Sequence, residues 1–235
     1  MKNKINKIQK PNGEFDKKYF SLGYPFILGI DEAGRGALAG PVVSCGFLAA
    51  KKDLEFLKKL EVNDSKLISI DNRLIIYNEL IKSGMKFYIS IIDNKIIDKI
   101  NILQATLQSF QEISEFFLNF KCFILADGNK FFQNCPIPYE TVIKGDSKSL
   151  VIAAASIIAK VTRDNLMSHE MNDLYPEYNF IKHKGYATLE HRENILKYGI
   201  SKIHRLSFLK NMNLQNDNIL FDIKDKQGEL FNEKI

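Results

Sequence analysis

Residues 26–50 read FILGIDEAGRGALAGPVVSCGFLAA, and this stretch is the most informative part of the sequence about the fold. The apolar run 26–30 predicts a buried strand that ends in two acids, Asp31 and Glu32. A glycine-rich segment follows, and residues 41–50 predict a second strand. Two early strands joined by a tight turn, followed by strands and helices in mixed order, indicate an α/β domain with a mixed, layered sheet.

Apolar periodicity predicts further elements of both kinds beyond this pair. Strands are expected near residues 86–92 and 122–126, and helices near 71–83, 101–118, 147–174 and 189–198. The organisation of the chain follows from these elements. We expect a flexible basic arm over residues 1–25, a folded domain with a helical C-terminal part over residues 26–210, and an acidic tail over residues 211–235.

The composition is that of an ordinary globular protein. Of 235 residues, 45% are apolar and 26% are charged, which excludes a disordered chain, a collagen-like repeat and a disulfide scaffold. No window approaches the ~18 uncharged apolar residues of a membrane span, and the polar N-terminus lacks the apolar core of a secretory signal. Cys45, Cys122 and Cys135 form no CxxC pair. We therefore expect small buried thiols in a reducing compartment, the cytoplasm, and nothing demands more than a monomer.

The net charge of +5 is unevenly distributed. Between Lys182 and Lys210, seven Lys or Arg residues stand against only Glu190 and Glu193. A basic face of this kind suits an anionic partner such as nucleic acid. A solvated surface stretch would account for the same charge, so the pattern alone does not choose between the two.

Three acids stand where predicted strands end. Asp31 and Glu32 close the first strand, and Asp127 closes the strand near residues 122–126. Neighbouring side chains of a strand point to opposite faces. Asp31 and Glu32 can therefore serve one site only if the chain bends at Glu32, and the glycine-rich residues 33–36 provide that bend. Acids that follow strands are also common turn formers, so each position has a structural explanation as well.

Asp164 is a fourth acid of interest because it falls on the apolar face of its predicted helix. It follows Ile157 by seven residues and Val161 by three. A lone carboxylate on a packed face is costly unless it is paired or binds a cation. A capping role, or pairing with Arg163 or Lys160, would also satisfy it.

Convergence of these four acids would require metal. Four carboxylates in one place repel one another unless divalent cations neutralise them. Oxygen ligands favour Mg²⁺ or Mn²⁺, and two such ions on one phosphate can activate a water and stabilise the leaving oxygen. No histidine has a ligand partner at metal spacing, so zinc is not expected. The order of the acids along the chain does not by itself establish convergence.

Longer motifs run in order from about residue 26 to residue 209. The first is GIDEAGRG at 29–36, followed by LAGPVV at 38–43. The others are short: DSK at 64–66, KGD at 144–146, AAASIIAK at 153–160, TRD at 162–164, HKGY at 183–186, IHR at 203–205 and SF at 207–208. Together they resemble the motifs of the ribonuclease HII family.

The resemblance implies an RNase H-like fold, with a mixed β-sheet flanked by helices, and a metal-dependent endonuclease. The family cuts RNA paired to DNA. It also nicks duplex DNA on the 5′ side of embedded ribonucleotides, leaving a 3′-hydroxyl and a 5′-phosphate, and thereby serves ribonucleotide removal. Its four catalytic carboxylates, which hold two Mg²⁺ or Mn²⁺ ions, fall on Asp31, Glu32, Asp127 and Asp164.

The resemblance also implies contacts with the ribonucleotide. The family's Gly-Arg-Gly turn falls on Gly34, Arg35 and Gly36. Two glycines let backbone N–H and C=O groups approach the 2′-hydroxyl that distinguishes RNA from DNA. The alternative is a tight β-turn with an exposed arginine. Tyr186 matches the family tyrosine that stacks on the neighbouring deoxyribose, whereas its residue type alone would indicate packing.

Four further side chains are candidates for phosphate contacts: Lys66, Lys144, Lys148 and His183. Such contacts contribute salt-dependent affinity and little specificity, and a solvated surface residue is the default interpretation of a lysine. The chain departs from the family pattern at three positions, none of them a carboxylate: Ala37, Asn179 and Ala187.

Residues 227–231 read QGELF and resemble the Gln-x-x-Leu-Phe peptides that dock on the bacterial DNA sliding clamp. Gln227, Leu230 and Phe231 would then bind the clamp as the segment orders. The alternative is that the two apolar residues pack on their own domain.

Two other functions compete with this interpretation. A ribonuclease HIII-like hybrid nuclease would carry a sizeable additional N-terminal domain, and about 25 residues before the first strand are too few for one. A non-catalytic nucleic-acid-binding module would gain nothing from carboxylates that face phosphates, so the presence of all four acids disfavours it.

Overall fold

The structure is a computed structural model that describes residues 10–210. The chain divides into two compact units. The first comprises Met1–Ala33, Val43–Ile91 and Thr106–Thr162, and the second comprises Gly34–Val42, Ile92–Ala105 and Arg163–Ile235. Within the described part of the chain, no helix combines the length and the apolar character that a membrane crossing requires.

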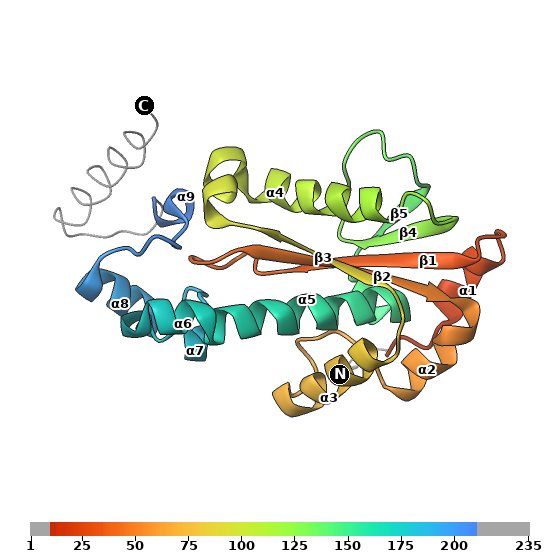
Figure 1. Cartoon of the computed structure of the whole chain (residues 1–235), viewed down its shortest axis with the longest axis horizontal. Helices are drawn as coiled ribbons and strands as arrows, with labels where there is room; N and C mark the ends of the chain where they lie inside the picture. Colours follow the sequence, from red (N-terminus) through yellow and green to blue (C-terminus); the bar gives the residue numbers. More distant parts are fainter. Residues whose placement is uncertain (1–9, 211–235) are drawn as a thin grey trace, which may run out of the picture. The chain divides into compact units, whose positions relative to one another are not determined.

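A five-stranded sheet in the order β3-β2-β1-β4-β5 is the framework of the first unit (Figure 1). Its strands are β1 (Phe26–Ala33), β2 (Val42–Ala50), β3 (Phe87–Ile92), β4 (Cys122–Asp127) and β5 (Tyr139–Val142). β2 pairs antiparallel with β1, whereas β4 pairs parallel with β1 and β5 pairs parallel with β4. The mixed sheet predicted from the sequence is therefore confirmed.

Helices account for most of the remaining regular structure. The α-helices are α1 (Glu14–Phe20), α2 (Leu54–Lys59), α3 (Ile70–Lys82), α4 (Asn94–Phe116), α5 (Leu150–Ser168), α6 (Glu170–Leu174), α7 (Phe180–His183), α8 (Leu189–Tyr198) and α9 (Leu206–Leu209). Short 3-10 turns are η1 (Lys51–Asp53), η2 (Gly145–Ser147) and η3 (Pro176–Tyr178). Helix α8 has the bounds that the sequence predicts.

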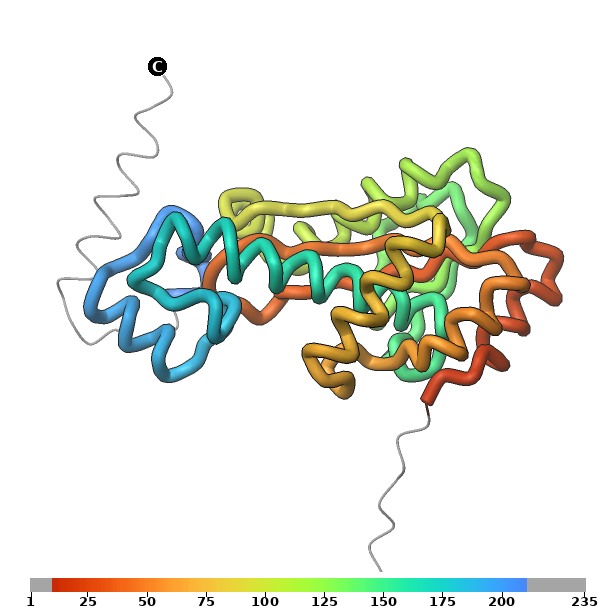
Figure 2. The backbone as a smooth tube through the Cα atoms, turned by 60° about the horizontal axis from the view of Figure 1, so that its bottom comes forward, coloured from red at the N-terminus to blue at the C-terminus, as the bar shows by residue number. Residues whose placement is uncertain are grey.

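Two hydrophobic clusters cover opposite faces of the sheet. Side chains alternate along β1, so Ile27 packs with the apolar residues of α5, whereas Leu28 and Ile30 pack with Phe110 and Ile113 of α4. Figures 1 and 2 show the parts of α4 and α5 that belong to this unit on the two sides of the sheet. The alternation also assigns Asp31 to the α5 face.

Gly29 lets α5 lie directly on the sheet. A Cβ built at Gly29 would be 2.5 Å from the backbone carbonyl carbon of Val151, which no side chain tolerates. Asp31 lies two residues beyond Gly29 in β1, about 6.6 Å along the strand. Ser156 lies five residues beyond Val151 in α5, about 7.5 Å along the helix. The close approach therefore brings the two side chains to the same level, where they hydrogen-bond.

Helix α1 lies inside the predicted N-terminal arm. Its Tyr19 and Asp16 are buried, and the Asp16 carboxylate accepts hydrogen bonds from the Ser149 hydroxyl and the Leu150 N–H. Residues 14–20 are thus part of the folded unit and not of a flexible arm. The helix begins after Gly13, which has no side chain to cap it, so the usual start signal is missing from the sequence.

Three predicted boundaries also differ from the structure. The helix predicted to begin at Asn101 does so after a kink, since Asn101 has a φ of 67° and its Oδ1 accepts from the Gln104 N–H at 3.1 Å, but α4 also includes an unpredicted helical segment from Asn94 before that kink. The helix predicted to extend to Leu174 is broken at His169 into α5 and α6. The bend predicted at Glu32 is wrong, because β1 continues to Ala33, opposite Val43 of β2.

The second unit has its own small core. Leu38 and Ala39 pack there with Met167 of α5, and with Tyr178 and Phe180, which follow α6. The Tyr178 and Phe180 rings stack with their centroids 5.4 Å apart. Segment 34–42 is therefore anchored through its C-terminal part.

We expect Gly29→Ala to destabilise the chain by about 1–3 kcal/mol or more, because the added methyl group overlaps the α5 backbone. Thermal unfolding followed by circular dichroism should show a melting temperature lower by ~2–4 °C per kcal/mol. Gly36→Ala is the matched control, since no atom of the described residues lies within 4 Å of a Cβ built there. Equal melting temperatures for the two variants would contradict the close approach of α5.

Candidate active site

Strand register brings Asp31 and Asp127 side by side. β1 and β4 are parallel neighbours with Ile30 opposite Ala126, so the next pair along the two strands is Asp31 and Asp127. Both lie at the carboxyl ends of their strands, which is where open α/β sheets place their ligand sites. Asp31 is only 5% exposed and Asp127 is half-buried. β4 ends at Asp127 as predicted, whereas β1 continues past Asp31 and Glu32 to Ala33.

The Asp31 carboxylate sits in a polar niche between the sheet and α5. It accepts a hydrogen bond from the Glu32 N–H at 2.7 Å and one from Ser156, whose hydroxyl also lies 3.1 Å from the Ser65 hydroxyl. Burial, followed by the charges of Glu32 and Asp127, raises the pKa of Asp31 well above its usual value. The hydrogen bonds oppose that shift without cancelling it.

Asp146 belongs to the same cluster, although the sequence analysis did not place it among the carboxylates. It lies in η2, just after β5, the parallel neighbour of β4. The N–H of the adjacent Gly145 donates to Asp127 Oδ1 at 2.6 Å. Burial, then Asp64 and Asp127, raises the pKa of Asp146 to about 6. The carboxyl ends of three parallel strands thus supply Asp31, Asp127 and Asp146.

Lys66 is the cation of this cluster. Burial alone would lower the pKa of its ammonium. The pKa is nevertheless raised, because four carboxylates act on it: Asp64, Asp31, Asp146 and Asp127. In the absence of a ligand, the lysine predicted to contact phosphate therefore offsets part of the negative charge of the site.

The donor set of this cluster suits a hard divalent cation. All of its acidic ligands are carboxylate oxygens, and their raised pKa values reflect burial and mutual repulsion that a bound cation would relieve. As the side chains stand, no group of three or more His, Cys, Asp or Glu residues between residues 10 and 210 is arranged to hold a metal ion. Glu32 is half-buried, and its charge raises the pKa of Asp31 more than the charge of Asp127 does, so Glu32 belongs to the same cluster.

The second unit contains the Gly-Arg-Gly turn and Tyr186. Ala37 N–H donates to the Gly34 carbonyl at 3.3 Å and closes the turn, in which Arg35 and Gly36 are exposed. Ala37 also forms an antiparallel bridge with Tyr186. The turn exists and its arginine is exposed, which fits both the predicted ribonucleotide contact and the structural alternative, and the turn lies beside Tyr186.

Buried histidines fix the backbone around Tyr186. Ser201 N–H donates to His204 Nδ1, so His204 Nε2–H donates to His191 Nε2 at 3.1 Å, and His191 Nδ1–H donates to the Tyr186 carbonyl at 2.9 Å. Only neutral rings allow this chain of hydrogen bonds. Burial lowers the pKa of His191 to about 4 and that of His204 to about 3.

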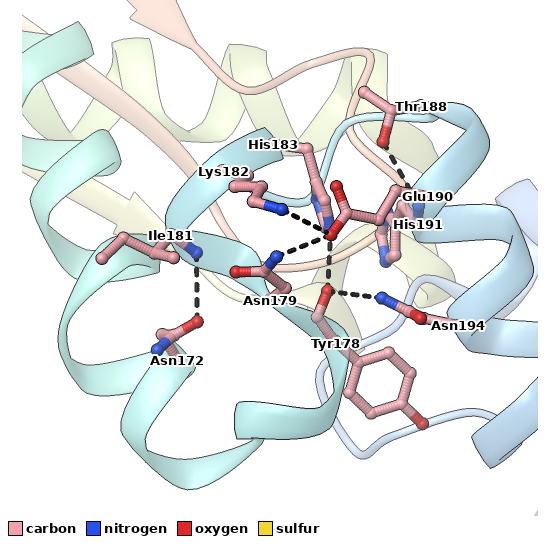
Figure 3. Close-up of polar contacts among 10 residues, drawn as sticks. All are labelled: Asn172, Tyr178, Asn179, Ile181, Lys182, His183, Thr188, Glu190, His191 and Asn194. Carbon is pink, nitrogen blue, oxygen red and sulfur yellow. Dashed lines mark hydrogen bonds and ion pairs between the residues drawn. The ribbon is translucent and has the colours of Figure 1, made fainter.

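His183 does not fit its predicted role as a phosphate contact. It is buried, its Nδ1 accepts from the Gly185 N–H, and its Nε2 donates to the Tyr178 carbonyl at 2.8 Å. Figure 3 shows this carbonyl, which also accepts a hydrogen bond from Asn194, and the His183 ring beside His191. Both ring nitrogens are thus used inside the protein.

Comparison with known proteins decides the family. The family model described as ribonuclease HII matches residues 28–211. A ribonuclease HII of Chloroherpeton thalassium is 43% identical over 194 residues, which cover 83% of this chain and 94% of the relative. The chain belongs to the ribonuclease HII family. It is therefore a metal-dependent endoribonuclease of the RNase H class, which acts on RNA–DNA hybrids.

Solved structures resemble this ribonuclease HII chain over most of its length. RNase HII in the PCNA:RNase HII complex of Archaeoglobus fulgidus superimposes with a TM-score of 0.65 and 25% identity, over 81% of this chain and 97% of that one. Bst-RNase HIII in complex with Mn²⁺ superimposes with a TM-score of 0.64 over 88% of this chain and 73% of that one, at 16% identity. The second comparison supports the fold alone.

The remaining predicted site residues of this family member have varied surroundings. Lys144 and Lys148 are exposed on either side of η2, as phosphate contacts would require. Asp164 is half-buried in the part of α5 that belongs to the second unit. Arg205, counted in the predicted basic face, is fully buried and donates to the carbonyls of Gly40 and Arg35. Gln227, Leu230 and Phe231 lie outside the described residues.

Proposed function

We propose that this ribonuclease HII nicks duplex DNA on the 5′ side of embedded ribonucleotides, leaving a 3′-hydroxyl and a 5′-phosphate, and so serves ribonucleotide removal. The gathering of Asp31, Asp127 and Asp146 at the carboxyl ends of three parallel strands carries this proposal. A buried carboxylate cluster with one lysine is suited to phosphodiester chemistry, in which charge develops on phosphate oxygens.

Asp31, Glu32 and Asp127 are the proposed ligands of two Mg²⁺ or Mn²⁺ ions, with a fourth carboxylate completing the set. Bound divalent ions would supply an activated water and stabilise the leaving oxygen. The protein groups have separate tasks. Ser156 orients the Asp31 carboxylate, and Gly145 N–H holds Asp127 Oδ1.

We propose Asp146 as the fourth carboxylate ligand. Its charge interacts with Asp127 and Asp64, and it follows a strand that is parallel to β4. Asp164, the residue predicted from the sequence, lies in the part of α5 that belongs to the second unit. Substitution of each acid distinguishes the two assignments.

Substrate recognition is assigned to the turn of Gly34, Arg35 and Gly36 together with Tyr186. The exposed Gly36 lets a sugar approach the backbone, and Arg35 is exposed for a phosphate contact. Lys66, Lys144 and Lys148 are the proposed phosphate contacts of the first unit. They would contribute salt-dependent affinity for both hybrid and ribonucleotide-containing DNA.

The alternative functions have weaker support. A ribonuclease HIII-like preference for runs of ribonucleotides is supported by likeness in fold to solved RNase HIII structures at 16% and 20% identity, which is too low to carry a function. A non-catalytic binding module would not need a buried carboxylate cluster at the strand ends. We propose a monomer that works in the cytoplasm. Residues 227–231 are proposed to dock on the sliding clamp, and the relative from Archaeoglobus fulgidus was solved in a complex with PCNA.

Cleavage of matched duplexes with zero, one or four ribonucleotides tests the nuclease proposal. In the presence of Mg²⁺ or Mn²⁺, the native chain should cut the duplexes with one and four ribonucleotides and leave the all-DNA duplex intact. Asp31→Asn and Asp127→Asn should lower the rate by a factor of about 10² or more, because each removes a metal ligand. Asp146→Asn should do the same, whereas Asp164→Asn should retain most activity. Robust cutting by Asp31→Asn would contradict the site, and the reverse order for Asp146 and Asp164 would reassign the fourth ligand.

Deletion of residues 226–235 tests the clamp proposal. The truncated chain should lose binding to the purified sliding clamp in a pull-down, because the Gln, Leu and Phe anchors are gone. Its cleavage of free duplex should be unchanged. Leu230→Ala with Phe231→Ala is the matched variant of full length. Retained clamp binding by both variants would remove the proposed docking peptide.

A further inference from the structure

A buried guanidinium lies beneath the turn that carries Gly34, Arg35 and Gly36. Arg163, in α5, has no exposed surface. Its Nε donates to the Pro41 carbonyl at 2.9 Å and its Nη2 donates to the Ala39 carbonyl at 3.1 Å. The planar guanidinium therefore holds residues 39–41, which follow the turn in segment 34–42, through their backbone carbonyls.

The same guanidinium reaches the segment that carries Tyr186. Arg163 Nη1 donates to the Lys184 carbonyl at 3.0 Å, and the guanidinium carbon lies 5.2 Å from the centroid of the Tyr186 ring. An arginine over an aromatic ring at this distance makes a cation–π contact. One side chain thus bonds the turn segment and the tyrosine segment, both within the second unit.

Arg163 also separates the roles of the two glycines in the turn. A Cβ built at Gly34 would lie 1.9 Å from Arg163 Nε, and the φ of Gly34 is +96°. A Cβ built at Gly36 meets no atom of the described residues within 4 Å. Gly34 is therefore required by the guanidinium beneath it, whereas Gly36 is the glycine whose outer side is open to a ligand.

We propose that Arg163 is a positioning residue for ribonucleotide recognition, which fixes the Gly36 backbone and the Tyr186 ring in one arrangement so that both meet the same sugar. The proposal rests on the proposed function and deepens it. Lysine cannot replace this arginine, because a single ammonium on a flexible stem cannot hold three carbonyls in a plane. Arg163 acts through the turn and the tyrosine and does not itself touch substrate.

The test compares the native chain with the Arg163→Lys variant. The quantity compared is the preference of each for a duplex that contains a ribonucleotide over an all-DNA duplex. One measures KM for a DNA duplex with one internal ribonucleotide, and Ki for the same duplex made entirely of DNA as a competitor. The ratio Ki/KM does not depend on the fraction of active enzyme, so partial unfolding cannot change it. We expect the ratio to fall about tenfold or more in Arg163→Lys, with Ki itself unchanged, because misplacement of positioning groups is costly.

Arg73→Lys is the matched control. Arg73 is also a buried arginine that donates to a backbone carbonyl, that of Ile68, but it lies in the first unit. Its substitution should leave Ki/KM at the native value. A native ratio in Arg163→Lys would overturn the proposal. Failure of the native chain to cut the duplex with one ribonucleotide would instead contradict the proposed function, so the two failures are distinguishable.

Hydrogen exchange gives a second, independent readout. The N–H groups of Leu38 and Ala39 both donate to the Gly185 carbonyl, so they report on the contact between the two segments. Exchange in a peptide spanning residues 34–41 should accelerate in Arg163→Lys, while peptides of β1 keep the native rate. Unchanged exchange would overturn the proposal. If Arg163→Lys does not fold, Arg163→Gln carries the same test, since its uncharged amide can still donate two hydrogen bonds.

Discussion

The parallel pairing of β1 with β4 is the constraint on which the rest of the site depends. Its register places Asp31, which is buried, beside Asp127, which is half-buried, at the carboxyl ends of the two strands. The two carboxylates repel each other, and neighbouring groups limit that cost. Ser156, Gly145 N–H and Lys66 each supply a donor or a positive charge. The remaining negative charge is the basis on which we propose that the site binds cations.

The turn of Gly34, Arg35 and Gly36 is held in place by hydrogen bonds from buried side chains to its segment. Its shape is not determined by its own side chains, since two of its three residues are glycines. Buried arginines instead hold the backbone of the segment through carbonyl groups: Arg163 bonds Ala39 and Pro41, and Arg205 bonds Arg35 and Gly40. Neutral histidines fix the Tyr186 carbonyl in the same unit. These hydrogen bonds leave Arg35 and Gly36 exposed, which is what the proposed sugar contact requires.

Sequence patterns predicted the strands that end in acids, because an uninterrupted apolar run followed by a carboxylate is a strong local signal. Asp31 and Asp127 were found in this way. Asp146 was missed because β5, with the sequence YETV, is short and mostly exposed, so it carries no apolar run. The sequence signal that could have identified Asp146 was the KGD motif at residues 144–146. His183 was misassigned because burial and the use of both ring nitrogens depend on residues distant in the chain.

We propose that Asp31, Asp127 and Asp146 bind cations together. Calorimetric titration of Mn²⁺ into metal-free protein is a direct test of this shared site. The native chain should bind Mn²⁺, and Asp31→Asn and Asp146→Asn should each weaken binding by about tenfold or more, since loss of an outer-shell group alone costs about 10–100-fold. Native affinity in both variants, or no binding by the native chain, would contradict a shared cation site at the ends of β1, β4 and β5.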